Sequence, residues 1–308
     1  MLSRPQKIAL ALLRFVLKAL ALLPMWLLYG LADLCSLLLQ YVVRYRRRVV
    51  RRNLSRAYPQ WTSRELRRTE RGFYRFFCDY VVETLKLFHV SDEAMRRRFV
   101  FRNIDLANTL AQDGRPLFVY LGHYANWEYM TSITLWSDSR LSACQVYHPL
   151  SSAVMDALML DLRKRFHSVG IAQKQTFRDL LRMKNSDQQP LLGLIADQRP
   201  PRKHHDVWTT FLRQPTALIT GSERIGRRMN AHFLYADITV VRRGHYEVTL
   251  HEITPRDDDE NSVSRDYMDL LQQSIDRDPR YYLWSHNRWK WSPADFPSAD
   301  FPSAEAPA

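Results

Sequence analysis

A histidine and a glutamate five residues apart, His123 and Glu128, are the strongest candidates for chemistry in this 308-residue sequence. They lie in LGHYANWEYM, directly after an apolar stretch that is typical of a buried strand. On a continuous helix, five residues turn the chain by about 500°, which would leave the two side chains about 140° apart. They can therefore meet only if His123 lies in the turn after the strand and Glu128 in the first turn of the next helix.

Such a pair could perform general base catalysis. A carboxylate that binds one imidazole nitrogen leaves the other nitrogen free to accept a proton. The start of a helix also favours developing negative charge. The spacing alone is a weak signal that also arises by chance, with a surface histidine and an ordinary glutamate at a helix start.

The elements that must position this pair are predicted to alternate between strands and helices. Strands are expected within 115–124, at 190–196, and as a hairpin of 231–241 and 245–253 around the turn 242–244. Helices are expected at 63–88, with a cap at Ser63, and at 127–135, 155–166, 177–184, 217–226 and 263–275. This alternation predicts an α/β fold, with a layered mixed sheet flanked by helices.

The N-terminal region is mostly apolar from residue 8 to residue 43. Its window 19–39 carries one charge, Asp33, and has about the length of a membrane span. Pro24, Gly30 and Asp33 interrupt it, so two interpretations stay open: one spanning helix, or two amphipathic helices lying in the membrane interface. The run is too long for a cleaved signal peptide.

The positive charge is concentrated near this apolar segment. Residues 1–75 hold 16 Lys or Arg and 3 Asp or Glu, whereas residues 76–308 hold 29 of each, so the whole net charge of +13 lies in the first quarter. Seven arginines fall between Arg44 and Arg56. Arginines beside an apolar helix predict contact with anionic lipid head groups at a membrane surface. The neutral remainder argues against nucleic acid as a partner.

We therefore expect four segments. They are an apolar membrane anchor at 1–43, a basic and aromatic helical segment at 44–90, an α/β catalytic domain at 91–292, and a disordered tail at 293–308 that repeats ADFPS.

Other sites of chemistry find little support in the sequence. His204 and His205 are adjacent, so their side chains point apart and lack a third ligand at metal spacing. Three widely separated cysteines favour neither a zinc site nor a disulfide framework. The chain has no G-x-S-x-G motif and no glycine-rich phosphate loop. We expect no metal and no cofactor.

Five motifs follow one another along the chain, and their order is typical of a known family. They are the arginine-rich stretch after an apolar segment, GHYANWE, YHPLSS followed by LRKRF, IADQRP, and YYLWSHNRWK. In this arrangement the chain, from about residue 10 to residue 292, resembles the late acyltransferases of lipid A biosynthesis, of the lauroyl/myristoyl type. That family lies within the lysophospholipid acyltransferase superfamily. The resemblance implies a glycerolipid acyltransferase-like fold. The implied activity is transfer of a fatty acyl group from an acyl carrier protein thioester to a hydroxyl of a membrane lipid, on the cytoplasmic side of a bacterial inner membrane.

The resemblance also implies roles for individual residues. His123 matches the general base and Glu128 the acid that orients it. Arg163 and Arg165 both match a region where the family keeps an arginine for the transition state, and the choice between them stays open. Asp197 and Gln198 match a second block that shapes the site. His286 and Arg288 belong either to a head-group site or to the edge of the core.

Two departures from the common family pattern, Ala196 before Asp197 and Asn287 after His286, leave the acceptor open. The acceptor is expected to be a lipid A precursor. The alternatives are an aminolipid or lysophospholipid acceptor, and a relative that binds lipid without catalysis.

Overall fold

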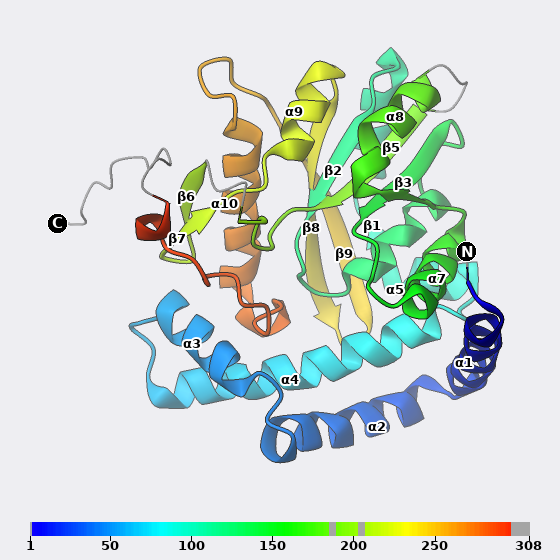
Figure 1. Cartoon of the computed structure of the whole chain (residues 1–308), viewed down its shortest axis with the longest axis vertical. Helices are drawn as coiled ribbons and strands as arrows, with labels where there is room; N and C mark the ends of the chain where they lie inside the picture. Colours follow the sequence, from blue (N-terminus) through cyan, green and yellow to red (C-terminus); the bar gives the residue numbers. More distant parts are fainter. Residues whose placement is uncertain (1, 185–188, 203–206, 297–308) are drawn as a thin grey trace.

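The apolar strand before His123 lies at the centre of a seven-stranded sheet (Figure 1). The computed structural model describes residues 2–184, 189–202 and 207–296. The strand order is β1-β9-β8-β2-β5-β3-β4. Its members are β1 (Phe99–Phe101), β2 (Leu117–Leu121), β3 (Leu141–Tyr147), β4 (Val169–Ala172), β5 (Gln189–Ile195), β8 (His232–Arg242) and β9 (His245–Ile253).

The sheet is mixed, as predicted. Only β8 and β9 pair antiparallel among its neighbours, and they form the expected hairpin. The parallel strands β2, β5 and β3 end at the same edge, and all five residues of β2 are buried. Such an edge is where α/β sheets commonly place their sites.

Helices surround this sheet. Their bounds are α1 (Arg4–Leu22), α2 (Met25–Leu37), α3 (Arg47–Ala57), α4 (Ser63–Lys86), α5 (Asp92–Arg98), α6 (Ile104–Leu110), α7 (Ala153–Arg163), α8 (Thr176–Lys184), α9 (Gly221–Arg228) and α10 (Ser262–Arg277). A 3₁₀ helix, Trp127–Leu135, follows His123 where a helix was predicted. The long helix α4 begins at Ser63, as expected, but its cap is Thr62, which forms a capping box with Glu65; the predicted cap at Ser63 is wrong.

One predicted helix was misplaced. Residues 217–226 were expected to be helical, but α9 begins at Gly221. Ala217 is the last residue of a separate hairpin of β6 (Trp208–Phe211) and β7 (Gln214–Ala217), and residues 218–220 connect this hairpin to α9. A four-residue strand gives too short a pattern to be distinguished from the start of a helix.

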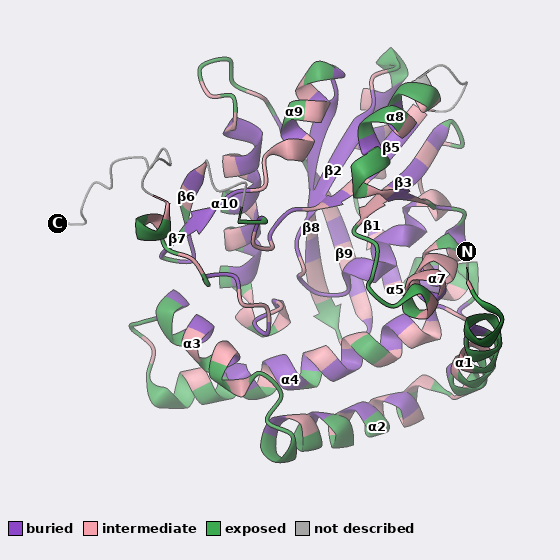
Figure 2. Ribbon diagram, in the orientation of Figure 1, coloured by how far each residue is buried: buried purple, intermediate pink, exposed green. Residues whose placement is uncertain are grey.

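The apolar N-terminal window is divided into two helices. Helix α1 ends at Leu22 and α2 begins after Pro24, so window 19–39 is not one continuous helix. A π-helical turn, Leu38–Val42, extends α2. The combined helix Met25–Val42 is long and apolar enough, with a mean hydropathy of 1.4, to be a candidate membrane span, and 22% of it is buried in the protein. In Figure 2 much of the outer surface of α1 and α2 is exposed, while α2 runs alongside α4.

Polar contacts hold α2 to the body of the protein. Asp33, the charge inside the apolar window, accepts hydrogen bonds from Arg75 at 2.9 Å and from Arg243 at 2.8 Å. The Tyr29 hydroxyl donates to the buried carboxylate of Glu83 at 2.9 Å. Asp33 therefore has a structural role in docking α2.

Part of the predicted disordered tail is ordered. Pro293–Asp295 forms a turn of 3₁₀ helix, and the Phe296 ring lies 6.0 Å from the Trp208 ring. Residues 297–308, which include the second ADFPS copy, lie outside the described residues.

Candidate active site

The turn that carries His123 is held closely against α10. A Cβ on Gly122 would lie 2.3 Å from the Leu271 Cδ1 atom, so any larger residue would have to displace the Leu271 side chain. The Tyr267 hydroxyl donates to the Leu121 carbonyl at 2.9 Å. Ala125 has a φ of 52°, and its amide donates to the Tyr281 carbonyl at 2.9 Å. These contacts fix the direction in which the imidazole leaves the end of β2.

Asp197 is the carboxylate that binds His123. Its Oδ1 atom lies 2.6 Å from His123 Nδ1, and its Oδ2 accepts the His123 backbone amide at 3.1 Å. An ionised carboxylate only accepts hydrogen bonds, so Nδ1 carries the hydrogen and Nε2 keeps its lone pair. Nε2 lies 3.2 Å from the Gln198 side-chain amide.

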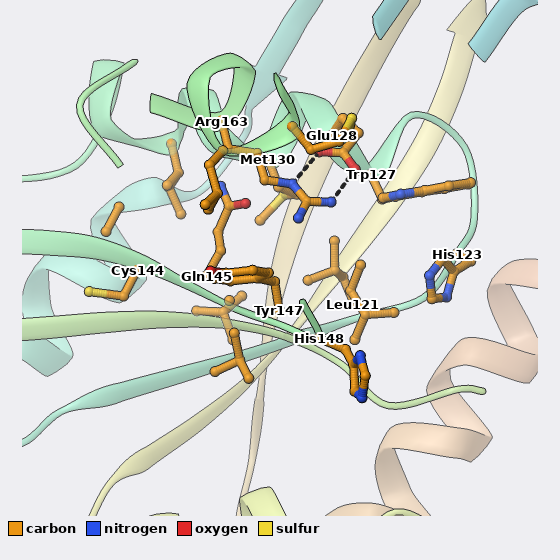
Figure 3. Close-up of a pocket in the computed structure, with 18 of the residues that line it drawn as sticks. Leu121, His123, Trp127, Glu128, Met130, Cys144, Gln145, Tyr147, His148 and Arg163 are labelled. Carbon is orange, nitrogen blue, oxygen red and sulfur yellow. Dashed lines mark hydrogen bonds and ion pairs between the residues drawn. The ribbon is translucent and has the colours of Figure 1, made fainter. Parts of the chain in front are cut away.

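The predicted contact between Glu128 and His123 is therefore wrong. Glu128 does lie in the first turn of the helix, but it forms a bidentate ion pair with Arg163, at 2.7 and 3.0 Å. In Figure 3 the Trp127 indole lies between Glu128 and His123, and its ring centroid is 5.0 Å from that of the imidazole. Placing Glu128 in the first helical turn thus directs it to α7 and away from the turn that precedes it.

Electrostatics favour an ionised Asp197. Burial opposes its charge, but the attraction and hydrogen bonds of His123 outweigh burial, and the pKa of Asp197 lies below its usual value. Burial alone would lower the pKa of Arg163. The hydrogen bonds and negative charge of Glu128 outweigh burial, so the pKa of Arg163 is raised. Both sites hold a buried negative charge that is paired.

The structure distinguishes the two candidate arginines. Arg163 lines the cavity beside His123. Arg165 turns away, because its guanidinium donates to the Val90 carbonyl and to Asp92, each at 2.8 Å.

The C-terminal candidates lie behind the site. Arg288 is buried and donates to the Ala217 carbonyl at 2.5 Å, so it belongs to the core. His286 Nε2 accepts the Arg199 amide at 3.3 Å. Burial lowers the pKa of His286 to about 4, so this imidazole is neutral.

A cavity of about 580 Å³ opens beside His123 over one face of β2, β5 and β3 (Figure 3). Its lining is mainly apolar, with Leu121, Met130 and Ile133 among its members. His123 and Gln198 also line it, as does the Glu128–Arg163 pair. Gly193, at the middle of β5, lies level with Val119 and Gln145 and leaves the floor free of a side chain. An apolar cavity of this size can hold a fatty acyl chain.

Strand β3 and its contribution to the cavity were missed. Ala143, Gln145 and Tyr147 line it, but LSACQVY mixes small and polar residues and gives only a weak strand signal. These residues line the cavity because β3 pairs with β5, which brings β3 beside the strands that carry the site.

No group of three or more possible metal ligands occurs among the described residues. His204 and His205 lie outside them. Cys35, Cys78 and Cys144 are free. The described site is thus an imidazole held by a carboxylate at one end of an apolar cavity, an arrangement suited to removing a proton from a hydroxyl.

Comparison with known proteins agrees with this chemistry. The model of the bacterial lipid A biosynthesis acyltransferase family matches residues 2–291. A lipid A biosynthesis palmitoleoyltransferase of Escherichia coli strain K12 is 22% identical over 259 residues, which cover 82% of this chain and 81% of the relative. A lipid A biosynthesis acyltransferase of Shigella flexneri has the same identity and coverage. The chain belongs to the bacterial lipid A biosynthesis acyltransferase family, and it is an acyltransferase.

Proposed function

We propose that the protein transfers a fatty acyl group from an acyl carrier protein thioester to a hydroxyl of a lipid A precursor. We assign this reaction to the cytoplasmic side of a bacterial inner membrane. The observation that carries the proposal is the His123–Asp197 pair at one end of the apolar cavity of about 580 Å³. The cavity would bind the acyl chain of the donor, and the imidazole would act on the acceptor.

The proposed reaction begins at His123 Nε2, which takes the proton as the acceptor oxygen attacks the thioester carbonyl. Asp197 supports the imidazolium that forms, through its 2.6 Å contact with Nδ1. The carbon–sulfur bond then breaks, and His123 returns the proton to the leaving thiolate. No covalent acyl-enzyme is needed, because a thioester is already an activated donor.

Gln198 is our candidate for stabilising the carbonyl oxygen. Its amide lies 3.2 Å from His123 Nε2, where the acceptor hydroxyl would bind. A hydroxyl in that position would release the amide to donate to the developing oxyanion. Arg163 also lines the cavity, and we assign it to shaping the chain-binding region together with Glu128.

Membrane association is proposed from the exposed faces of α1 and α2. Phe15 and Trp26 are 73% and 74% exposed, and Leu12, Leu34 and Val42 are also exposed. Since polar contacts dock α2 along the body, we favour an interfacial position for these helices over a spanning one. The acceptor lipid would then reach the site without leaving the membrane.

The test is acyl transfer by the full-length protein in mixed micelles, with product detected by mass spectrometry. We expect transfer from the carrier protein thioester to a lipid A precursor, and none to a lysophospholipid. His123→Ala should lower the rate at least ~100-fold, the lower range for loss of a general base. A folded His123→Ala protein with near-normal transfer would contradict the mechanism, and preference for acyl-coenzyme A would contradict the donor.

A further inference from the structure

We propose that a second cavity, beside α3, binds an anionic oxygen group, a phosphate or carboxylate, on the head of the lipid acceptor. The inference rests on the proposed acyl transfer and assigns a place to its second substrate. The cavity has a volume of about 450 Å³ and lies between α3 and the segment 289–295.

Positive charge predominates in this cavity. Arg52, Arg56 and Lys290 line it, against one carboxylate, Asp295, so three cations minus one anion leave a local charge of +2. Asp295 is already bound by the Ser292 amide at 2.8 Å and hydroxyl at 3.0 Å, and these bonds lower its pKa. Asp295 therefore stays ionised, and this single negative charge offsets only one of the three cations.

Two buried donors in the lining lack a partner. Gln214 is 7% exposed, and its Nε2 atom makes no hydrogen bond among the described residues. The buried Nε of Arg52 is likewise unpaired in the part of the chain that the structure describes. A buried donor without an acceptor is costly. Both donor atoms are closed to solvent, so an oxyanion held by the positive charge of the cavity would reach them through a shift of the Arg52 and Gln214 side chains.

Aromatic and basic groups extend the site at its rim. Lys290 Nζ lies 4.7 Å from the centre of the Trp291 ring, and the Arg202 guanidinium lies 5.1 Å from the same ring. Such cations are attracted to the ring face, which keeps them near the cavity without using their hydrogen-bond donors.

The cavity is connected to His123 through one hydrogen-bonded segment, residues 283–290. Leu283 lines the acyl cavity, and its amide donates to the His123 carbonyl at 3.0 Å. The chain then runs to Lys290, held on the way by buried bonds from Arg288 to Ala217 and from Trp289 to the Thr216 hydroxyl.

The two cavities lie on different sides of the catalytic turn. In Figure 1, α3 and the C-terminal segment lie left of the sheet centre, whereas α7 and β3, which line the acyl cavity, lie to its right. The donor chain and the acceptor head would therefore approach His123 from opposite sides. The exposed apolar turn Leu38–Val42 lies shortly before α3 in the chain, so lipid chains would have an apolar surface near the head-group cavity.

The test removes charge from the cavity without disturbing the fold. We choose Arg56→Gln and Lys290→Gln, singly and together, because both side chains line the cavity and, within the described part of the chain, neither forms a hydrogen bond or ion pair. Arg48→Gln is the matched control: it removes the same charge from α3, but Arg48 is exposed and does not line the cavity.

The assay measures KM for the acceptor and for the donor thioester in mixed micelles, using a phosphorylated lipid A precursor and the same lipid after phosphatase treatment. Each cavity variant should raise the acceptor KM about fivefold and the double variant about 25-fold, as expected for partly exposed charge pairs. The kcat and the donor KM of the cavity variants should stay within about twofold of those of the original protein. Arg48→Gln should match the original protein. With the dephosphorylated lipid, the acceptor KM should be the same for all variants.

The other outcomes each overturn the proposal. A rise confined to the donor KM would assign the cavity to the acidic carrier protein. An equal effect of Arg48→Gln would indicate general attraction to an anionic surface. Inorganic phosphate that binds the cavity, with no change in acceptor KM in the variants, would show an adventitious anion site. In all three cases His123-dependent transfer would persist, so the proposed reaction would stand without this subsite.

Discussion

Asp197→Asn should nearly abolish acyl transfer while leaving the protein folded. In the structure, one Asp197 oxygen accepts the His123 backbone amide and the other faces Nδ1 of the ring. An asparagine has only one oxygen. The backbone amide is always a donor and will take that oxygen, so the asparagine NH₂ must face Nδ1.

That exchange reverses the imidazole tautomer. Nδ1 would have to accept, the hydrogen would move to Nε2, and the base would lose the lone pair that faces the acceptor. The charge that supports the imidazolium is lost as well. We expect a fall in kcat of up to ~10⁴-fold, equivalent to about 5 kcal/mol of barrier, and a loss of stability of only about 1 kcal/mol because volume and the backbone bond are kept.

Single-turnover rates and urea unfolding of Asp197→Asn measure the two effects separately. Glu128→Gln is the matched control, because it makes the same chemical change in a buried acid that does not bind His123. Near-normal turnover in Asp197→Asn, or a larger rate loss in Glu128→Gln with the fold intact, would refute the assignment of Asp197 as the carboxylate that supports the base.

Three further results are expected. Glu128→Gln should lower the free energy of unfolding by about 3 kcal/mol in urea titrations, because it breaks a bidentate pair and leaves Arg163 with an uncompensated, largely buried charge; an unchanged midpoint would contradict this. Burial lowers the pKa of His286 to about 4 from the ordinary 6.5, so between these pH values only the unfolded chain binds the proton. The free energy of unfolding should therefore fall by about 2–3 kcal/mol as the pH drops from 6.5 to 4. His286→Gln should remove this pH dependence, and the same pH dependence in the variant and the original protein would contradict the prediction. Phe15→Asp combined with Trp26→Asp should weaken sedimentation with lipid vesicles while leaving urea unfolding unchanged, since both side chains are mostly exposed; undiminished binding would place the membrane contact elsewhere.

Local patterns in the sequence determined much of the fold. The buried strand before His123, the helix with Glu128 in its first turn, the long helix α4 and the β8–β9 hairpin all follow from periodicity and turn residues within short stretches. The order of motifs along the chain identified the family. These features depend on neighbours in sequence, so one sequence is enough to predict them.

The partner of His123 depended on tertiary structure. Glu128 is five residues away and was the obvious choice, whereas Asp197 is 74 residues away. The parallel pairing of β2 with β5 places Leu121 level with Ile195, and His123 and Asp197 each follow their strand residue by two positions. Both side chains therefore leave the same edge of the sheet and meet there. Glu128 reaches Arg163 instead, because Arg163, 35 residues further along the chain, offers a largely buried cation that local spacing cannot reveal. The sequence determined which residues could do the chemistry, and strand pairing across the sheet decided which of them act together.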